Sequence, residues 1–214
     1  MPAATQVKIC GLKTPEALRA AIEAGADMAG FVFFEKSPRH LSLEQARGLG
    51  AMATGKVVKV ALVVDAADAA IAAIIEALKP DWLQLHGKEN PARIADIRTR
   101  FGLPVMKAFG ISTHNDLAGA LEGGTGADRL LFDAKAPKNA ALPGGNGLAF
   151  DWTILAGVKL DRAWMLSGGL DSENVAKAIA LTGAPGVDVS SGVESAPGVK
   201  DIAKIAAFVA RAKR

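Results

Sequence analysis

Short apolar runs alternate with amphipathic segments along the whole chain. The runs are rich in Val, Leu, Ile and Phe, as is typical of strands that are buried on both faces of a parallel sheet. The pattern predicts eight such strands, at residues 7–10, 29–34, 56–64, 82–85, 105–109, 129–132, 163–166 and 187–190.

The segments between these runs carry start signals of helices. A capping side chain followed by Pro or Glu is typical of a first helical turn. Such signals are found at Thr14-Pro15-Glu16, Ser42-Leu43-Glu44-Gln45, Asn90-Pro91 and Asp171-Ser172-Glu173. A further helix can begin at Phe150, and the last is expected from about Lys200. Eight strands alternating with eight helices predict an α/β fold, a single (β/α)8 TIM barrel over residues 1–214, rather than an open doubly wound sheet.

Composition agrees with one globular domain. The chain has 214 residues, half of them hydrophobic, and can therefore bury a large core. Its 25 Lys and Arg against 22 Asp and Glu give a net charge of +3. This excess is dispersed, with no Lys/Arg block or basic–aromatic stripe, so no nucleic acid partner is expected. A small net positive charge is also compatible with a small-molecule substrate that carries negative charge.

The chain has one cysteine, so no disulfide framework exists within it. Its start lacks the charged and apolar segments of a signal peptide, and the alanine-rich stretch 69–75 is far too short to span a membrane. We therefore expect a cytoplasmic protein with no membrane partner. The oligomeric state is left open between monomer and homodimer.

In such barrels the reactive groups gather at the C-terminal ends of the strands. Cys10 ends the first strand and Asp133 the sixth. A thiol at the barrel mouth can serve as a base or a nucleophile if its pKa is lowered, although a lone cysteine is usually a small buried hydrophobe. Asp133 would need a raised pKa to act as a general acid near neutrality, which burial can give; alternatively it caps the next turn or pairs with Lys135.

Three further strand-end residues are candidates for substrate binding. Arg39 follows Ser37-Pro38, a stiff turn, and can bind a carboxylate through two hydrogen bonds or lie solvated on the surface. His86, after the fourth strand, can donate to substrate or only to a backbone carbonyl. Asp188, in the eighth strand, can serve a substrate or a structural pair. No His, Asp and Glu cluster has metal spacing, so no metal is expected.

The last two strand ends indicate a phosphate site. Gly168 and Gly169 let backbone N–H groups approach a ligand, and Ser190, Ser191 and Gly192 offer hydroxyl and backbone donors. The loops after strands seven and eight are the usual phosphate site of this fold. The alternative is that both segments are tight turns, which Gly and Ser also favour.

The connection at 134–149 is long for a βα loop, and such loops are usually functional or disordered. With Gly144, Gly145 and Gly147 as flexible points, it predicts a lid that shields Asp133 from water. Its lysines, Lys135 and Lys138, are either solvated or help to attract an anionic substrate.

Taken together, these residues resemble the phosphoribosylanthranilate isomerase family of tryptophan biosynthesis. The resemblance covers essentially the whole chain, and the motifs are highly specific in this order. They are KICGLKTPEAL (8–18), GFVFFEKSPRHLSLEQA (30–46), LQLHG (83–87), LLFDAKAPKNAALPGGNGLAFDW (130–152), LSGGL (166–170) and GVDVSSGVESAPGVKD (186–201).

The resemblance implies a barrel without metal or organic cofactor. It implies an Amadori rearrangement of N-(5-phosphoribosyl)anthranilate to 1-(2-carboxyphenylamino)-1-deoxyribulose 5-phosphate. The matching motifs assign Cys10 of KICG as the general base, Asp133 of LFDAK as the general acid and Arg39 of SPR as the holder of the anthranilate carboxylate. Two alternatives are another phosphosugar-binding barrel enzyme and a non-catalytic barrel that binds a phosphate ligand.

Overall fold

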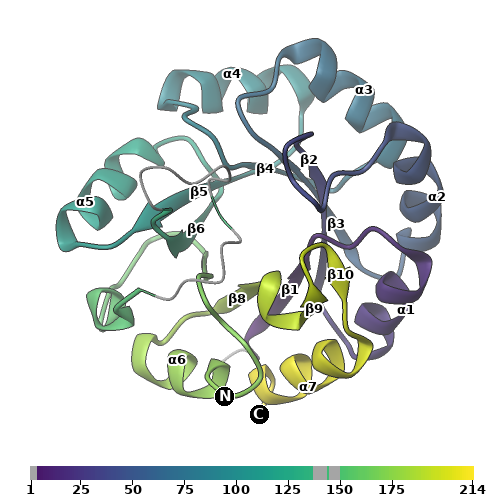
Figure 1. Ribbon diagram of the computed structural model, residues 1–214. Helices are drawn as coiled ribbons and strands as arrows, with labels where there is room; N and C mark the ends of the chain where they lie inside the picture. The colour runs from purple at the N-terminus through teal and green to yellow at the C-terminus, as the bar shows by residue number, and fades with distance from the viewer. Residues whose placement is uncertain (1–3, 137–143, 145–149) are drawn as a thin grey trace.

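Eight parallel strands close into a barrel in chain order, because the last strand, β8, pairs with the first, β1. The computed structural model describes residues 4–136, 144 and 150–214. Helices surround the barrel on its outside (Figure 1). The predicted fold class, a closed (β/α)8-type barrel, is thereby confirmed.

The eight predicted strands all form, and no end differs from the prediction by more than two residues. The buried Val, Leu, Ile and Phe side chains that predicted them pack between the barrel and the helices. The strands are β1 Gln6–Cys10, β2 Met28–Phe33, β3 Val58–Val63, β4 Trp82–Leu85, β5 Val105–Ile111, β6 Arg129–Ala134, β7 Trp164–Leu166 and β8 Gly186–Val189.

Three of the predicted helix starts are capped as their residue types suggest. The Thr14 side chain accepts from the N–H of Ala17 at 3.2 Å. The Asn90 side chain likewise accepts from a backbone N–H in the first turn of the helix that follows it. Ser42 and Gln45 cap each other reciprocally. The α-helices are α1 Pro15–Glu23, α2 Leu43–Ala53, α3 Asp68–Leu78, α4 Pro91–Phe101, α5 His114–Gly123, α6 Val175–Thr182 and α7 Ile202–Ala212.

The prediction of eight helices was wrong at one place in the described chain. Between β6 and β7 the described residues hold only a short 3-10 helix, η1 Trp152–Leu155. The Asp151 side chain caps it, but Gly157 follows with a φ of +73°, a conformation that an α-helix does not permit. The helix predicted from Asp171 also begins later, at Val175, because Asp171 and Asn174 bond to each other's backbone in a turn.

Alternation along each strand decides which side chains enter the barrel. Successive side chains of a strand point to opposite faces, so residues two apart share the interior. The interior layer towards the strands' N-terminal ends is apolar, built from Met28, Val60, Met106, Ala108, Leu131 and Met165. The layer above it, nearer the strands' C-terminal ends, contains polar groups, and it carries the candidate site.

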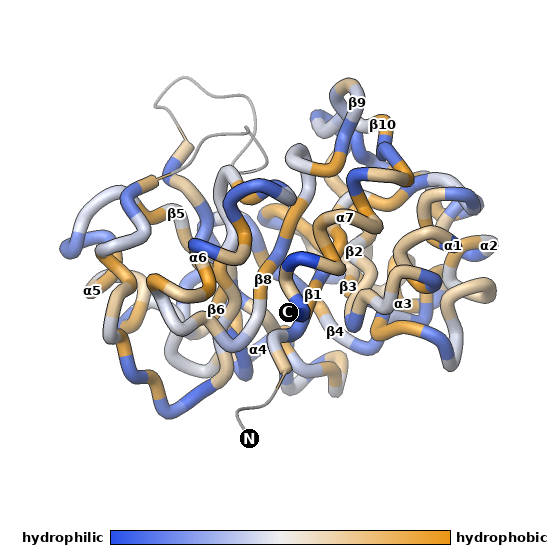
Figure 2. Tube along the Cα trace, turned by 90° about the horizontal axis from the view of Figure 1, so that it is seen from below, coloured by the Kyte–Doolittle hydropathy of each residue, from blue (hydrophilic) through white to orange (hydrophobic). Residues whose placement is uncertain are grey.

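A hairpin that was not predicted covers part of that end. After β8 the chain forms a 3-10 turn, η2 Ser191–Val193, and then two short antiparallel strands, β9 Glu194–Ala196 and β10 Val199–Lys200. The hairpin lies at the end of the barrel opposite the N-terminus (Figure 2). In the described part of the chain no helix is both long enough and apolar enough to cross a bilayer.

Candidate active site

A cleft of about 790 Å³, including the part open to solvent, occupies the C-terminal end of the barrel. Both predicted catalytic residues and all three predicted substrate-binding residues line it, together with four of the five predicted phosphate-binding residues. The predicted residues in its walls are Cys10, Arg39, His86, Asp133, Gly168, Gly169, Asp188, Ser190 and Ser191. The fifth, Gly192, lies behind the cleft, against the carbonyl of Leu170.

Cys10 ends β1 and is 4% exposed. Its register partner on β2 is Gly30, and a Cβ at that glycine would lie 2.9 Å from the Cys10 sulfur and 3.0 Å from Lys8 Nζ. Gly30 therefore makes the room in which the thiol and the ammonium group meet. Burial raises the pKa of the Cys10 thiol, and Asp188 adds to the rise, whereas the ammonium groups of Lys8 and Lys200 act against it.

Lys8 and Asp188 form a buried ion pair beneath the thiol. They are register partners on β1 and β8, and Lys8 Nζ lies 2.7 Å from Asp188 Oδ1. The other oxygen of Asp188 accepts from Ser167 Oγ at 3.2 Å. Burial acts to lower the pKa of Lys8, but Asp188 and Cys10 outweigh it and raise that pKa, so Lys8 stays charged. Asp188 thus lines the cleft while it pairs with Lys8 and accepts a hydrogen bond from Ser167.

Asp133 lies at the end of β6, where its Oδ2 is 3.6 Å from Nε2 of His86. Its other oxygen accepts from the N–H of Ala134 at 2.8 Å. Burial, with the charge of Lys107, lowers the pKa of His86 to about 4, so the imidazole is neutral at pH 7. The ring that faces Asp133 is therefore neutral, while the charge of Arg39 also acts on Asp133.

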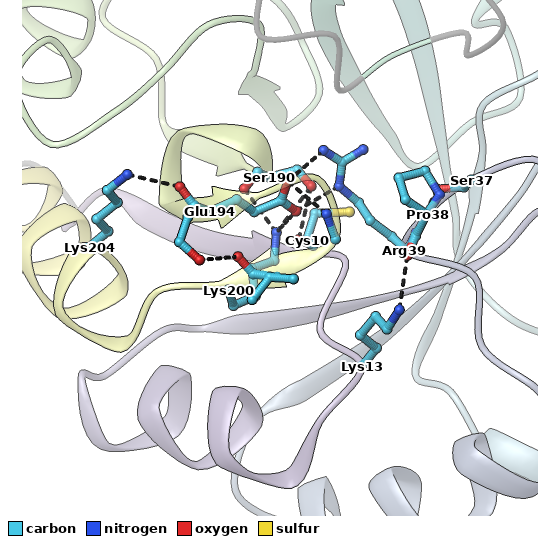
Figure 3. A network of polar contacts seen from close by, with 12 residues as sticks. Cys10, Lys13, Ser37, Pro38, Arg39, Ser190, Glu194, Lys200 and Lys204 are labelled. Carbon is cyan, nitrogen blue, oxygen red and sulfur yellow. Dashed lines mark hydrogen bonds and ion pairs between the residues drawn. The ribbon is translucent and has the colours of Figure 1, made fainter.

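Arg39 enters the cleft from the loop after β2, and its side chain is 7% exposed. The hydroxyl of Ser37 accepts from the Arg39 N–H at 3.1 Å, which fixes the turn that the sequence predicted. The guanidinium donates from both Nε and Nη2 to the carboxylate of Glu194, each at 2.8 Å. Figure 3 shows this fork between the Arg39 turn and the hairpin.

Sequence reasoning missed Glu194 and Lys200. Lys200 Nζ lies 2.8 Å from the Glu194 carboxylate and donates to the carbonyl of Ser190 at 2.9 Å (Figure 3). The hydroxyl of Ser190 in turn donates to the carbonyl of Cys10 at 3.1 Å. Both missed residues lie in the motif at 186–201 and belong to a hairpin, for which Ala196-Pro197-Gly198 is a local turn signal.

The two predicted phosphate loops lie side by side in the cleft wall. Gly168 and Gly169 follow β7 with φ values of +87° and +68°, conformations that favour glycine. Ser190 and Ser191 follow β8. The hydroxyl of Ser190 is engaged with Cys10 and Lys200, so the donors these loops offer to an anion are chiefly backbone N–H groups and Ser191.

The predicted lid falls largely outside the described residues, which omit 137–143 and 145–149, and with them Lys138, Gly145 and Gly147. Of the segment 134–149, Ala134, Lys135 and Gly144 line the cleft. Lys135 forms an ion pair with Asp116 at the start of α5.

The family model and the relatives that match this chain carry the same family name. A family model described as N-(5'phosphoribosyl)anthranilate (PRA) isomerase matches residues 7–211. The N-(5'-phosphoribosyl)anthranilate isomerase of Cereibacter sphaeroides is 57% identical over 211 residues, which cover 99% of this chain and 100% of the relative. The enzyme of the same name from a Bradyrhizobium species is 58% identical over 207 residues, covering 97% of this chain and 94% of that one.

Solved structures agree. The crystal structure of phosphoribosyl anthranilate isomerase from Thermotoga maritima superposes with a TM-score of 0.87 at 37% identity, covering 98% of both chains. A phosphoribosyl anthranilate isomerase in complex with reduced 1-(o-carboxyphenylamino)-1-deoxyribulose 5-phosphate gives a TM-score of 0.82 at 34% identity, again over 98% of both chains. This chain is therefore an enzyme of the N-(5'-phosphoribosyl)anthranilate isomerase family.

Proposed function

We propose that this chain catalyses the Amadori rearrangement of N-(5-phosphoribosyl)anthranilate to 1-(2-carboxyphenylamino)-1-deoxyribulose 5-phosphate, a step of tryptophan biosynthesis. Asp133 is the general acid and Cys10 the general base. The observation that carries the proposal is that one cleft is lined by the chain's single thiol, the Asp133 carboxyl, the Arg39 guanidinium and two glycine- and serine-bearing loops. Each group matches one demand of this substrate.

The reaction needs an acid first. Asp133 donates a proton to the ribose ring oxygen, the C1′–O bond breaks, and the opened sugar is left as a Schiff base with an iminium nitrogen. The place of Asp133 in the cleft supports this role, and the neutral His86 beside it holds no acidic imidazolium proton that it could donate instead. General acid catalysis of this kind contributes about 10²–10⁴-fold in rate.

The second proton transfer needs a base. The Cys10 thiolate takes the proton from C2′, which gives an enolamine that tautomerises to the ketone. Because burial raises the pKa of the free thiol, the thiolate needs positive charge nearby. Lys8 supplies one such charge and the iminium of the opened substrate a second, so the thiolate form is most populated at the step that uses it.

Two sets of groups in the cleft wall fit the two anionic ends of the substrate. The Arg39 guanidinium suits the anthranilate carboxylate, and the loops after β7 and β8 suit the 5′-phosphate. The ligand named in the complex of the relative carries the same two groups, a carboxyphenyl and a 5-phosphate. Holding both ends orients C2′ and the ring oxygen between Cys10 and Asp133.

The test is an assay with N-(5-phosphoribosyl)anthranilate, followed by the loss of anthranilate fluorescence. We expect activity in the parent, and losses of at least about 10²-fold in kcat for Cys10→Ala and Asp133→Asn. The matched control is Asp161→Asn, which neutralises a carboxylate that is 88% exposed and outside the cleft. An inactive parent would refute the function, and full activity in either cleft variant would refute that residue's role.

A further inference from the structure

The β9–β10 hairpin supports the turn that carries Arg39 as well as its side chain. The N–H of Gly198, at the hairpin's tip, donates to Glu194 Oε2 at 3.2 Å. A Cβ at Gly198 would lie 2.5 Å from the carbonyl oxygen of Pro38, so the tip packs directly against the residue before Arg39. The ammonium group of Lys13 donates to that same carbonyl at 3.0 Å (Figure 3).

The guanidinium is held in a single orientation by Glu194. A bidentate pair between a planar guanidinium and a carboxylate fixes the guanidinium plane as well as its position. The two donors that Glu194 accepts from, Nε and Nη2, lie on one edge of the group, and both bonds are 2.8 Å long. Glu194 itself does not line the cleft, whereas Arg39 does. Glu194 therefore acts on a ligand through the groups that it holds, of which Arg39 lines the cleft.

Lys200 is the third member of a buried charged cluster with Arg39 and Glu194, and its role follows from its charge. Arg39 and Glu194 alone would be a neutral pair, which attracts an anion weakly. Lys200, whose side chain is 1% exposed, adds a second positive charge 2.8 Å from the same carboxylate, so the three side chains together carry one net positive charge. Burial lowers the pKa of Lys200, and the charge and hydrogen bond of Glu194 act against that fall. Burial acts to raise the pKa of Glu194, but the hydrogen bond from Arg39 and the charge of Lys200 hold it below its ordinary value. Glu194 is thus an anion shared between two cations.

We propose that Glu194 and Lys200 are positioning residues for recognition of the substrate's aromatic carboxylate. Glu194 fixes the Arg39 guanidinium at the cleft, and Lys200 restores the positive charge that Glu194 cancels. This inference rests on the proposed function, because it assumes that Arg39 meets the anthranilate carboxylate. Lys200 also donates to the carbonyl and hydroxyl of Ser190. The same buried cation therefore contacts both the carboxylate that holds Arg39 and a proposed phosphate loop.

The test compares two substrates on each variant, N-(5-phosphoribosyl)anthranilate and N-(5-phosphoribosyl)aniline, which lacks the carboxylate. The measured quantity is the ratio of the two kcat/KM values, with the ketose product quantified by chromatography. This ratio is independent of the folded fraction of a preparation, since both substrates meet the same enzyme. We expect Lys200→Met to lower the parent's preference for the carboxylated substrate at least about tenfold, mainly through KM. Lys200→Arg, which keeps the charge, retains most of the preference.

The matched control is Lys204→Met. Lys204 also contacts Glu194 at 2.8 Å, but through the backbone carbonyl, and it is exposed. This variant removes the same charge from the chain and keeps the parent's preference. Glu194→Gln, which removes the charge between Arg39 and Lys200 but keeps the shape, also lowers the preference because the guanidinium loses its fork.

A second series shows whether the effect passes through Arg39. In an Arg39→Met background, Lys200→Met causes no further loss of the preference, because the group that it charges is absent. Equal losses on both substrates, or an undiminished effect of Lys200→Met without Arg39, would overturn the inference. An inactive parent would instead overturn the proposed function, so the two failures are distinguishable.

Discussion

Lys8 and Asp188 face each other across the seam where the barrel closes, as register partners 2.7 Å apart at their charged ends. Lys8 is fully buried, and Cys10, two residues further along the same strand, shares its side of the sheet. The ion pair therefore joins the first and last strands of the barrel, and its two charges also act on the thiol in the cleft. Its two roles can be measured separately.

Lys8→Met should destabilise the fold by about 3–5 kcal/mol, because it leaves Asp188 buried without its cation. Chemical denaturation measures this change in the free energy of unfolding. Lys59→Met is a matched control, since Lys59 is also a buried barrel lysine but donates to the hydroxyl of Thr54 rather than to a carboxylate. An equal cost in both variants would contradict the assignment. The double variant Lys8→Met with Asp188→Asn should regain part of the loss, because the unpaired charge is gone.

The same pair should control the titration of Cys10. The chain has one cysteine, so the ultraviolet absorbance of a thiolate reports this residue alone. In the ligand-free enzyme we expect the thiol pKa to lie above its ordinary value, as its burial requires. Lys8→Met should move it higher still, and Asp188→Asn should move it lower, because the first removes a nearby cation and the second a nearby anion. Shifts in the opposite directions would show that the pair does not govern the thiol.

The sequence predicts the barrel well because its signals there are local. Each strand is an apolar run bounded by turn residues, and helix starts such as Thr14 and Ser42 carry their own capping side chains. The prediction of a helix from Phe150 was wrong, since the chain leaves the helical conformation at Gly157, whose φ is +73°. Cys10, Asp133 and His86 could be placed at one end of the barrel because every parallel strand ends there.

Residues that act from outside a strand end were harder to predict. Glu194 meets Arg39 across 155 positions of sequence, and no local pattern indicates that pairing. Lys8 did carry a signal, because it shares with Cys10 the period-two positions that point into the barrel. A lysine at such a position needs a buried partner, but the sequence does not say which of several carboxylates supplies it.

Acid should weaken the fold through His86. Its pKa is 6.5 in an unfolded chain and about 4 in the folded protein, so between these pH values the unfolded state binds a proton that the folded state does not. Stability contributed by His86 is therefore complete above pH 6.5 and falls as the pH drops to 4, by up to about 3 kcal/mol. Denaturation of the parent and of His86→Gln at several pH values isolates this term as their difference. A difference that stays constant from pH 7 to pH 4 would contradict it.

Gly168→Ala should separate the cost of backbone strain from the cost of lost space in the proposed phosphate site. Gly168 has a φ of +87°, and a Cβ there would lie 2.5 Å from the backbone nitrogen of Ala134, next to Asp133. Gly183 has a similar φ of +67° at the end of α6, but a Cβ there meets nothing within 4 Å. Gly183→Ala therefore carries the strain alone, about 1 kcal/mol. Gly168→Ala should lose more stability than this and should also raise KM for the phosphorylated substrate, because the loop after β7 must move away from β6. Equal losses of stability with an unchanged KM would show that this close approach of β6 and β7 has no part in holding the substrate.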